Sequence, residues 1–163
     1  MKQVVCFDAA FHRTMPRTAQ LYGLPVKLAE EGIIRYGFHG LSYEYIVQAL
    51  ARQAGEQASR GRIAVAHFGN GASLAAIRDG KSVDTTMGFT PTGGLPMSTR
   101  SGDLDPGVIL YLLQEKNYSP CQVKELVTKK AGLLGLSGIS SDMKDLLAEE
   151  KGLCSTICGS FPQ

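Results

Sequence analysis

Several residues in the first hundred positions have side chains suited to the chemistry of a phosphate group. Arg100, in a loop, has a planar, permanently charged guanidinium that can clamp phosphoryl oxygens. The small residues of G-N-G-A-S, residues 69 to 73, let backbone N–H groups and the Asn70 amide approach a phosphate. His39, beside a glycine, can donate to a phosphoryl oxygen, and Asp8 can orient a phosphate acceptor. Phosphoryl transfer requires positioning and charge neutralisation above all, so the combination favours that chemistry.

Each candidate also has a structural interpretation, which the residues alone leave open. An Asn-Gly turn is most often just a hairpin, and a lone histidine such as His39 is more often hydrogen-bonded inside the fold. Arg100 can pair with Asp103 or Asp105 of its own loop, and Asp8 can cap a helix or a loop. Only the combination of residues indicates a site.

The elements expected around these residues make an α/β protein. Val4 to Phe7 is an apolar, β-branched stretch predicted to be a buried strand, and it places Asp8 at its carboxyl end, where α/β proteins place their chemistry. Ile33 to Tyr36 is a second strand candidate. The clearest local signal is a meander over residues 62 to 86, in which an Asn-Gly turn and an Asp-Gly turn separate three strands.

Proline, glycine and capping residues predict the helices. Short helices are expected over residues 16 to 21 and 25 to 31, and a longer one follows Gly40 and stops at Gly55. Its predicted apolar face contains Leu41, Tyr45 and Ala49, with Val47 or Gln48. His12 has no comparable surroundings to the other two histidines and is interpreted as structural.

Residues 88 to 107 are rich in Gly, Pro, Ser and Thr and are predicted to form a long ordered loop of the kind kept for function. Three helices are expected after it. The first begins at Pro106 with Asp105 as its cap, and the second runs from Ser119 and Pro120 through Lys130. The third runs from Asp142 to about Ala148 with Ser140 or Ser141 as its cap.

Composition excludes several classes of function. The 163 residues fall in the one-domain range, and 44% of them are hydrophobic. Lys and Arg total 17 against 15 Asp and Glu, without a block of either sign, so no nucleic-acid or membrane footprint is expected. The expected partner is a small molecule.

The four cysteines are scattered and predict neither a disulfide framework nor a zinc site; they are Cys6, Cys121, Cys154 and Cys158. The first ten residues contain Lys2 and Asp8 and lack the apolar core of a signal peptide. No stretch approaches the roughly 18 to 20 apolar residues that span a bilayer. The sequence therefore predicts a soluble, cytoplasmic protein.

Four long strings, in this order, closely resemble the acetate kinase (acetokinase) family: F-D-A-A-F-H, R-Y-G-F-H-G-L-S-Y-E-Y, H-F-G-N-G-A-S-L-A-A-I-R-D-G-K-S-V-D-T-T-M-G-F-T-P and S-T-R-S-G-D-L-D-P-G. The resemblance covers about residues 2 to 148. It implies part of an actin-like ATPase fold (ribonuclease H-like), a mixed sheet with flanking helices. It also implies transfer of the ATP γ-phosphoryl to acetate, which gives acetyl phosphate reversibly.

The resemblance assigns roles position by position. Arg100 and His39 match the stabilisers of the transferring phosphoryl, and Asp8 matches an active-site aspartate. The family's hairpin that contacts the nucleotide phosphates is matched by His67, Phe68, Gly69, Asn70 and Gly71. The family's segment that contacts the adenosine is matched by Asp142, Met143 and Lys144. Phe38 and Pro91 match part of the acetate-methyl pocket, which discriminates weakly between acetate and propionate because one methylene is worth only about 1–3 kcal/mol.

Departures from the family limit these expectations. Residues 1 to 148 correspond to the end of the family's first domain and the start of its second, and residues 149 to 163 are expected to be a divergent tail from a frameshift, a truncated gene or a natural end. The family's phosphate loop, its later adenine-binding segment and its magnesium ligands are missing, so ATP and Mg²⁺ are expected cofactors but no metal ligand is assigned. Ala9 stands where threonine is expected.

Two classes of function follow. In the first, the chain is part of an acetate kinase, or of a propionate or butyrate kinase, and is weak or inactive by itself; the full-length parent is expected to be a homodimer. In the second, the chain is a non-catalytic remnant. Unpaired strand edges and exposed apolar faces predict low solubility or aggregation.

Overall fold

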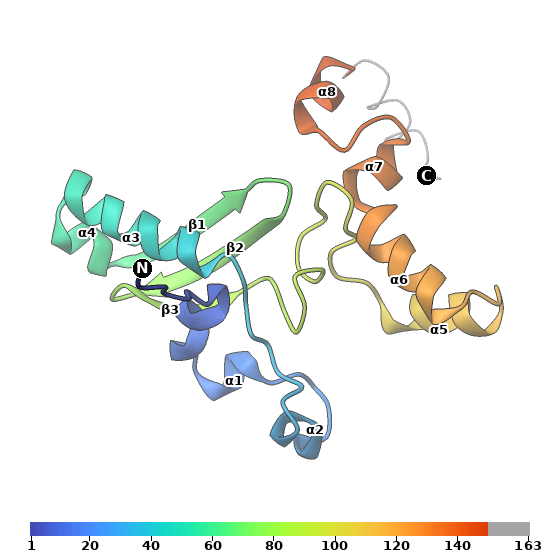
Figure 1. The fold of residues 1–163 in the computed structure, drawn as a ribbon, viewed down its shortest axis with the longest axis horizontal. Coiled ribbons are helices and arrows are strands. Elements are labelled where there is room, and N and C mark those ends of the chain that lie inside the picture. Colours follow the sequence, from blue (N-terminus) through green and yellow to red (C-terminus); the bar gives the residue numbers. More distant parts are fainter. Residues whose placement is uncertain (150–163) are drawn as a thin grey trace, which may run out of the picture. The chain divides into compact units, whose positions relative to one another are not determined.

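A computed structural model describes residues 1 to 149, which fall into two compact units. The N-terminal unit is Met1–Leu95, and the C-terminal unit begins at Pro96. Figure 1 shows that all the strands belong to the first unit, whereas the second contains only helices and loops within its described residues.

The N-terminal unit is built on a three-stranded antiparallel sheet with the strands in sequence order. The strands are β1 (Arg62–Phe68), β2 (Ala72–Arg78) and β3 (Lys81–Thr85). The predicted meander is therefore confirmed. Its Asp79-Gly80 turn has positive φ at both residues, 54° and 72°, as a tight two-residue hairpin turn requires.

One face of this sheet is covered by the helix α3 (Gly40–Ala54), which confirms the predicted long helix (Figure 1). Tyr43 packs there against Val65, Ala75 and Ile77 to form the core. The predicted helix face was wrong at Leu41 and Tyr45, which are 48% and 64% exposed, whereas Val47, one of its predicted members, packs against the core. The buried row starts at Tyr43, whose hydroxyl is hydrogen-bonded inside the fold, and continues with Ile46 and Val47.

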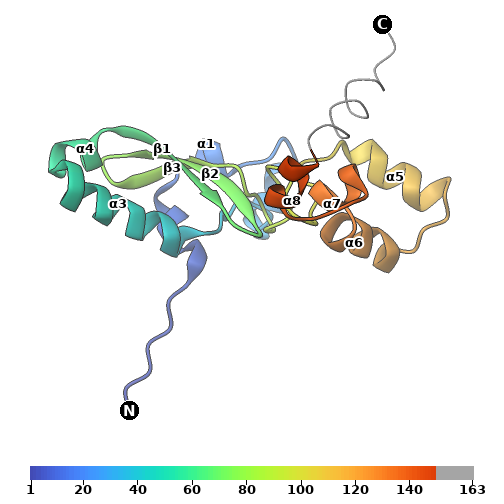
Figure 2. The same cartoon turned by 90° about the horizontal axis from the view of Figure 1, so that it is seen from above.

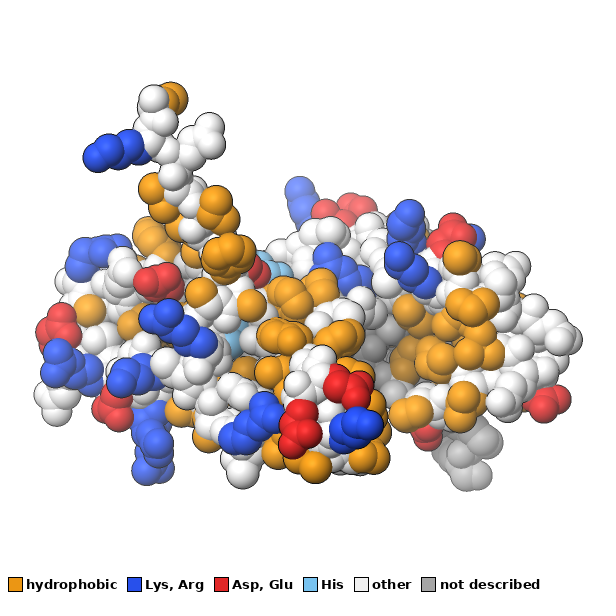
Figure 3. Space-filling model, turned by 60° about the horizontal axis from the view of Figure 1, so that its bottom comes forward, with side chains coloured by type: hydrophobic (Ala, Val, Ile, Leu, Met, Phe, Trp, Pro, Cys, Tyr) orange, Lys and Arg blue, Asp and Glu red, His pale blue; other side chains and the backbone are white. Residues whose placement is uncertain are grey.

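Two strand predictions were wrong. Residues 33 to 36 are irregular, and residues 1 to 7 extend from the body as a trace without regular structure (Figure 2). Val4, Val5 and Phe7 are 83%, 75% and 73% exposed, and Figure 3 shows hydrophobic side chains along this projecting segment. A β-branched stretch becomes a strand only beside another strand that completes its hydrogen bonds, and the described residues place none there.

Short helices complete the N-terminal unit. The predicted helices near residues 16 and 25 are confirmed as α1 (Arg17–Gln20) and α2 (Val26–Glu30). The 3-10 helix η1 (Asp8–Thr14) and the helix α4 (Glu56–Arg60) were not predicted. η1 packs against α3 and β3, so Asp8 begins a helical turn and does not end a strand.

The C-terminal unit contains α5 (Pro106–Gln114), α6 (Pro120–Lys129), α7 (Gly132–Ser137) and α8 (Met143–Ala148). Asp105 caps α5, and Ser119 forms a capping box with Gln122 at the start of α6, as predicted. The cap of α8 is Asp142, not Ser140 or Ser141, because the Asp142 carboxylate accepts from the Lys144 N–H at 2.8 Å. The α7 helix was not predicted.

The long loop between β3 and α5 is confirmed, and the α/β class is confirmed for the described residues. The predicted tail, residues 149 to 163, lies outside the described residues apart from Glu149. In residues 1 to 149 no helix is both long and apolar enough to cross a membrane.

Candidate functional site

Asp8 holds the N-terminus of α3. Its Oδ2 atom accepts from the backbone N–H of His39 at 2.6 Å, and its Oδ1 atom accepts from that of Leu41 at 3.3 Å. These N–H groups lack partners within the helix, and a carboxylate also opposes the helix dipole. A Cβ at Gly40 would clash with the Asp8 carbonyl oxygen and lie 2.8 Å from Phe11 Cβ, so glycine permits this close approach.

The capping interpretation of Asp8 is therefore confirmed. It does not exclude the proposed role in orienting a phosphate acceptor, which stays a prediction. Because Asp8 and His39 are 31 positions apart, the contact ties η1 to α3 and couples the aspartate to the backbone of the histidine.

His39 and His67 stack on each other. Their ring centroids are 4.0 Å apart with 23° between the planes. His39 has a left-handed backbone (φ 61°, ψ 21°), which a non-glycine residue adopts at a cost and which is common at functional sites. His39 Nδ1 lies 2.8 Å from Ser73 Oγ, and His67 Nδ1 lies 3.0 Å from Ser42 Oγ. The fold thus brings together two of the histidines that the sequence singled out.

Tyr43 and Ser73 support His39 from the core. Both are 0% exposed, and their hydroxyl groups are hydrogen-bonded to each other. Burial raises the pKa of Tyr43. Neither residue was predicted from the sequence, although Ser73 is two residues after Gly71 of the glycine hairpin and Tyr43 is four residues after His39 on α3.

The glycine hairpin is the turn between β1 and β2. Gly69 N–H donates to the Gly71 carbonyl oxygen at 2.9 Å, and Asn70 at the tip is exposed. A Cβ at Gly69 would lie 3.3 Å from His67 Nε2, so the small residue gives the imidazole room. Phe68, expected to contact nucleotide phosphate, is 75% exposed at the end of β1. The hairpin prediction is confirmed, whereas phosphate contact stays a prediction.

His12 is structural, as expected. It is 1% exposed, its Nδ1 atom lies 2.8 Å from Ser82 Oγ, and its Nε2 atom lies 2.9 Å from the Phe38 carbonyl oxygen. Burial lowers its pKa, which keeps the imidazole neutral inside the fold. The bond to Phe38 fixes the backbone immediately before His39. The Phe38 side chain is half-buried, and Pro91 is exposed in the loop after β3.

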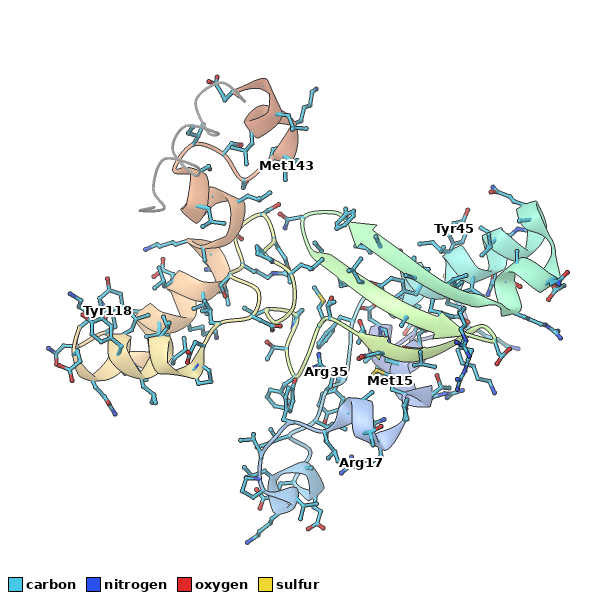
Figure 4. The ribbon with its side chains drawn as sticks, turned by 180° about the vertical axis from the view of Figure 1, so that it is seen from behind. Met15, Arg17, Arg35, Tyr45, Tyr118 and Met143 are labelled. Atoms are coloured by element: carbon cyan, nitrogen blue, oxygen red, sulfur yellow. The ribbon has the colours of Figure 1, made fainter. Side chains whose placement is uncertain are left out.

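Arg35 is a further residue that the sequence analysis missed. Its guanidinium Nη1 donates to the carbonyl oxygens of Thr85 and Thr86 at 3.1 and 3.2 Å, at the end of β3. Figure 4 shows Arg35 beside this segment. The arginine thereby joins the strand end to residues 33 to 38, the segment that leads into His39.

The other predicted site residues belong to the C-terminal unit. Arg100 is half-buried in its loop, with Nη1 3.5 Å from Met97 Sδ. A Cβ at Gly132, where φ is 62°, would clash with the Met97 carbonyl oxygen and lie 2.7 Å from that of Arg100. The start of α7 therefore fits closely against the arginine loop.

The segment Asp142 to Lys144 starts α8. The Asp142 carboxylate is engaged as the helix cap, and Met143 (Figure 4) is 51% exposed. Contact of these residues with adenosine stays a prediction.

Metal ligation has no support among residues 1 to 149. They contain no group of three or more His, Cys, Asp or Glu side chains that could hold a metal ion. Both oxygens of Asp8 already accept backbone N–H groups. No step involving Mg²⁺ is therefore assigned to these residues.

Known proteins are similar to this chain in sequence and in fold. The model of the Acetokinase family matches residues 1–154. An acetate kinase of Methylocella silvestris is 55% identical over 150 residues, which are 92% of this chain and 37% of that protein. An acetate kinase of Nitrobacter hamburgensis is 51% identical over 150 residues, which are again 92% of this chain and 37% of that protein. The chain thus spans little more than a third of the length of these curated relatives.

Two solved structures have the same fold. The crystal structure of Porphyromonas gingivalis acetate kinase gives a TM-score of 0.84 at 42% identity and covers 92% of this chain and 39% of that one. The crystal structure of a propionate kinase from Francisella tularensis gives a TM-score of 0.83 at 40% identity and covers 90% of this chain and 38% of that one. The described residues are thus a portion of an actin-like kinase fold. The chain belongs to the acetokinase family.

Proposed function

We propose that this chain is part of a kinase that transfers the γ-phosphoryl group of ATP to acetate. The observation that carries the proposal is the stacked pair His39 and His67, supported by Asp8 and adjoining the glycine hairpin at Gly69. Imidazole N–H groups beside a turn of small residues suit a site that binds phosphate oxygens. The 55% identity to an acetate kinase agrees with it.

In this reaction an acetate oxygen attacks the γ-phosphorus, the bond to the bridging oxygen breaks, and its electron pair leaves with ADP. The chain's own residues bind and orient. His39 and Arg100 stabilise the transferring phosphoryl, His67 to Gly71 hold the nucleotide phosphates, and Asp8 fixes the backbone of His39. Magnesium would neutralise the phosphates when bound, with ligands outside those described here.

Further residues have roles in the proposed reaction. Asp142, Met143 and Lys144 contact the adenosine, and Phe38 and Pro91 form part of the pocket for the acetate methyl. The likeness to a propionate kinase supports propionate as a second acceptor, since TM-scores of 0.84 and 0.83 do not separate the two. A cytoplasmic location and a homodimeric full-length parent belong to the same proposal.

A second candidate is a non-catalytic segment. It is favoured by the exposed apolar side chains of Val4, Val5 and Phe7, which suit an association surface.

A trapping assay decides between the two. The 163-residue chain is incubated with ATP, Mg²⁺, hydroxylamine and either acetate or propionate, beside its Arg100→Ala variant. The expected result is slow hydroxamate formation that the variant loses. Equal background in both proteins contradicts catalysis by this chain and favours the non-catalytic candidate.

A further inference from the structure

A chain of buried hydrogen bonds ends on His39. The Tyr43 hydroxyl is bonded to Ser73 Oγ, which in turn lies 2.8 Å from His39 Nδ1. Tyr43 and Ser73 are 0% exposed, so neither hydroxyl can exchange its partner for solvent. Which group donates in each of these two hydrogen bonds therefore decides which ring nitrogen of His39 carries a proton.

The Tyr43 proton points at Ser73. Ser73 Oγ is the one hydrogen-bond partner of the Tyr43 hydroxyl within residues 1 to 149, and a buried hydroxyl proton without an acceptor is costly. Burial also raises the pKa of Tyr43, so the phenol keeps its proton. With Tyr43 donating, Ser73 directs its own proton to His39 Nδ1, which accepts.

We propose that Tyr43 and Ser73 are positioning residues that hold His39 in the tautomer with its proton on Nε2. The inference rests on the proposed function, because a neutral imidazole donates to a phosphoryl oxygen only through a nitrogen that carries a proton. The reverse arrangement, with Nδ1 donating to Ser73, would leave one buried hydroxyl proton, that of Tyr43 or that of Ser73, without an acceptor. Tyr43 and Ser73 act through His39 and do not touch the phosphoryl.

The same unit contains a matched pair for comparison. Ser82 is also 0% exposed, and its Oγ atom also lies 2.8 Å from a histidine Nδ1, that of His12. There the Nε2 atom faces the Phe38 carbonyl oxygen at 2.9 Å, and a carbonyl can only accept. The tautomer of His12 is therefore fixed without its serine, so Ser82→Ala removes an equivalent hydroxyl without changing a tautomer.

The test is long-range ¹H–¹⁵N NMR of the imidazoles in the whole 163-residue chain. Spectra are recorded at a pH about two units above the ordinary histidine pKa of about 6.5, so that neutral rings are observed. In the unmodified chain His39 is expected to show a protonated Nε2 and a bare Nδ1. Ser73→Ala is expected to average the two nitrogen shifts, and Tyr43→Phe to move them part of the way. Ser82→Ala is expected to leave the tautomers of His39 and His12 unchanged.

Two results would overturn the proposal: a proton on Nδ1 of His39 in the unmodified chain, or unchanged His39 shifts in Ser73→Ala. If Ser73→Ala fails to fold, the unmodified chain and Tyr43→Phe decide by the same criteria. The measurement needs neither nucleotide nor turnover. A chain that shows the expected tautomer but makes no hydroxamate contradicts the proposed catalysis alone.

Discussion

Replacing Asp8 by alanine tests whether this carboxylate organises the site. The variant loses two acceptor contacts at the N-terminus of α3, at 2.6 Å and 3.3 Å. A hydrogen bond to a charged group is worth about 1.5–3 kcal/mol, and a charge at a helix end adds about 0.3–1 kcal/mol. Because the second contact is long, we expect α3 to lose about 2–3 kcal/mol of protection against local opening.

Native-state hydrogen exchange of the α3 amides measures this loss directly, because it reports local opening free energies. A loss of about 2–3 kcal/mol corresponds to exchange that is about 30 to 150 times faster. Asp8→Asn, which retains an acceptor oxygen but no charge, is expected to fall between alanine and the unmodified chain.

Asp105→Ala is the matched control. Asp105 also caps a helix, but through one local contact of 2.7 Å to the Gly107 N–H. Its loss is expected to cost about 1 kcal/mol and to affect α5 without changing exchange in α3. If Asp8→Ala leaves exchange in α3 unchanged, or changes it no more than Asp105→Ala does, the reasoning about the long-range cap is refuted.

Two further predictions concern backbone fit and pH. Gly132→Ala is expected to lower the melting temperature of the chain more than Gly138→Ala, because both glycines have φ near 65° (62° and 66°) but only Gly132 would meet the Arg100 loop; equal effects would contradict this. Burial lowers the pKa of His12 below its ordinary 6.5, so the unfolded chain binds more protons, and stability against urea is expected to be full above pH 6.5 and to decline as the pH falls below it. His12→Gln should be less stable but lack this decline, and an unchanged pH dependence in the variant would show that other groups cause it.

The sequence predicted the elements whose signals are local. The meander follows from its turn residues, and the α5 and α6 helices follow from caps at Asp105 and Ser119. Local patterning failed at Val4 to Phe7, since apolar β-branched residues specify a strand only where neighbouring strands are present. The 3-10 helix that begins at Asp8 was also missed, because Asp8 was assigned to the end of the predicted strand.

Candidate site residues could be recognised by type, but their arrangement could not. The stacking of His39 on His67 depends on pairing between α3 and the sheet, which spans 28 positions of sequence. The supporting roles of Tyr43, Ser73 and Arg35 depend on burial and on long-range hydrogen bonds that no local pattern reports. Asp8 acts as a helix cap from 31 residues away, beyond the reach of any capping rule based on spacing.

The most direct test of the central claim is a titration of the ¹⁵N-labelled chain with ATP, followed at its three histidines. We expect saturable shifts of His39 and His67 and of the Asn70 amide. His12, 1% exposed in the same unit, provides the internal control and should not move. Saturable shifts confined to the stacked pair and the hairpin would support a phosphate site there. Unchanged His39 and His67 resonances at saturating ATP, or shifts no larger than those of His12, would contradict it.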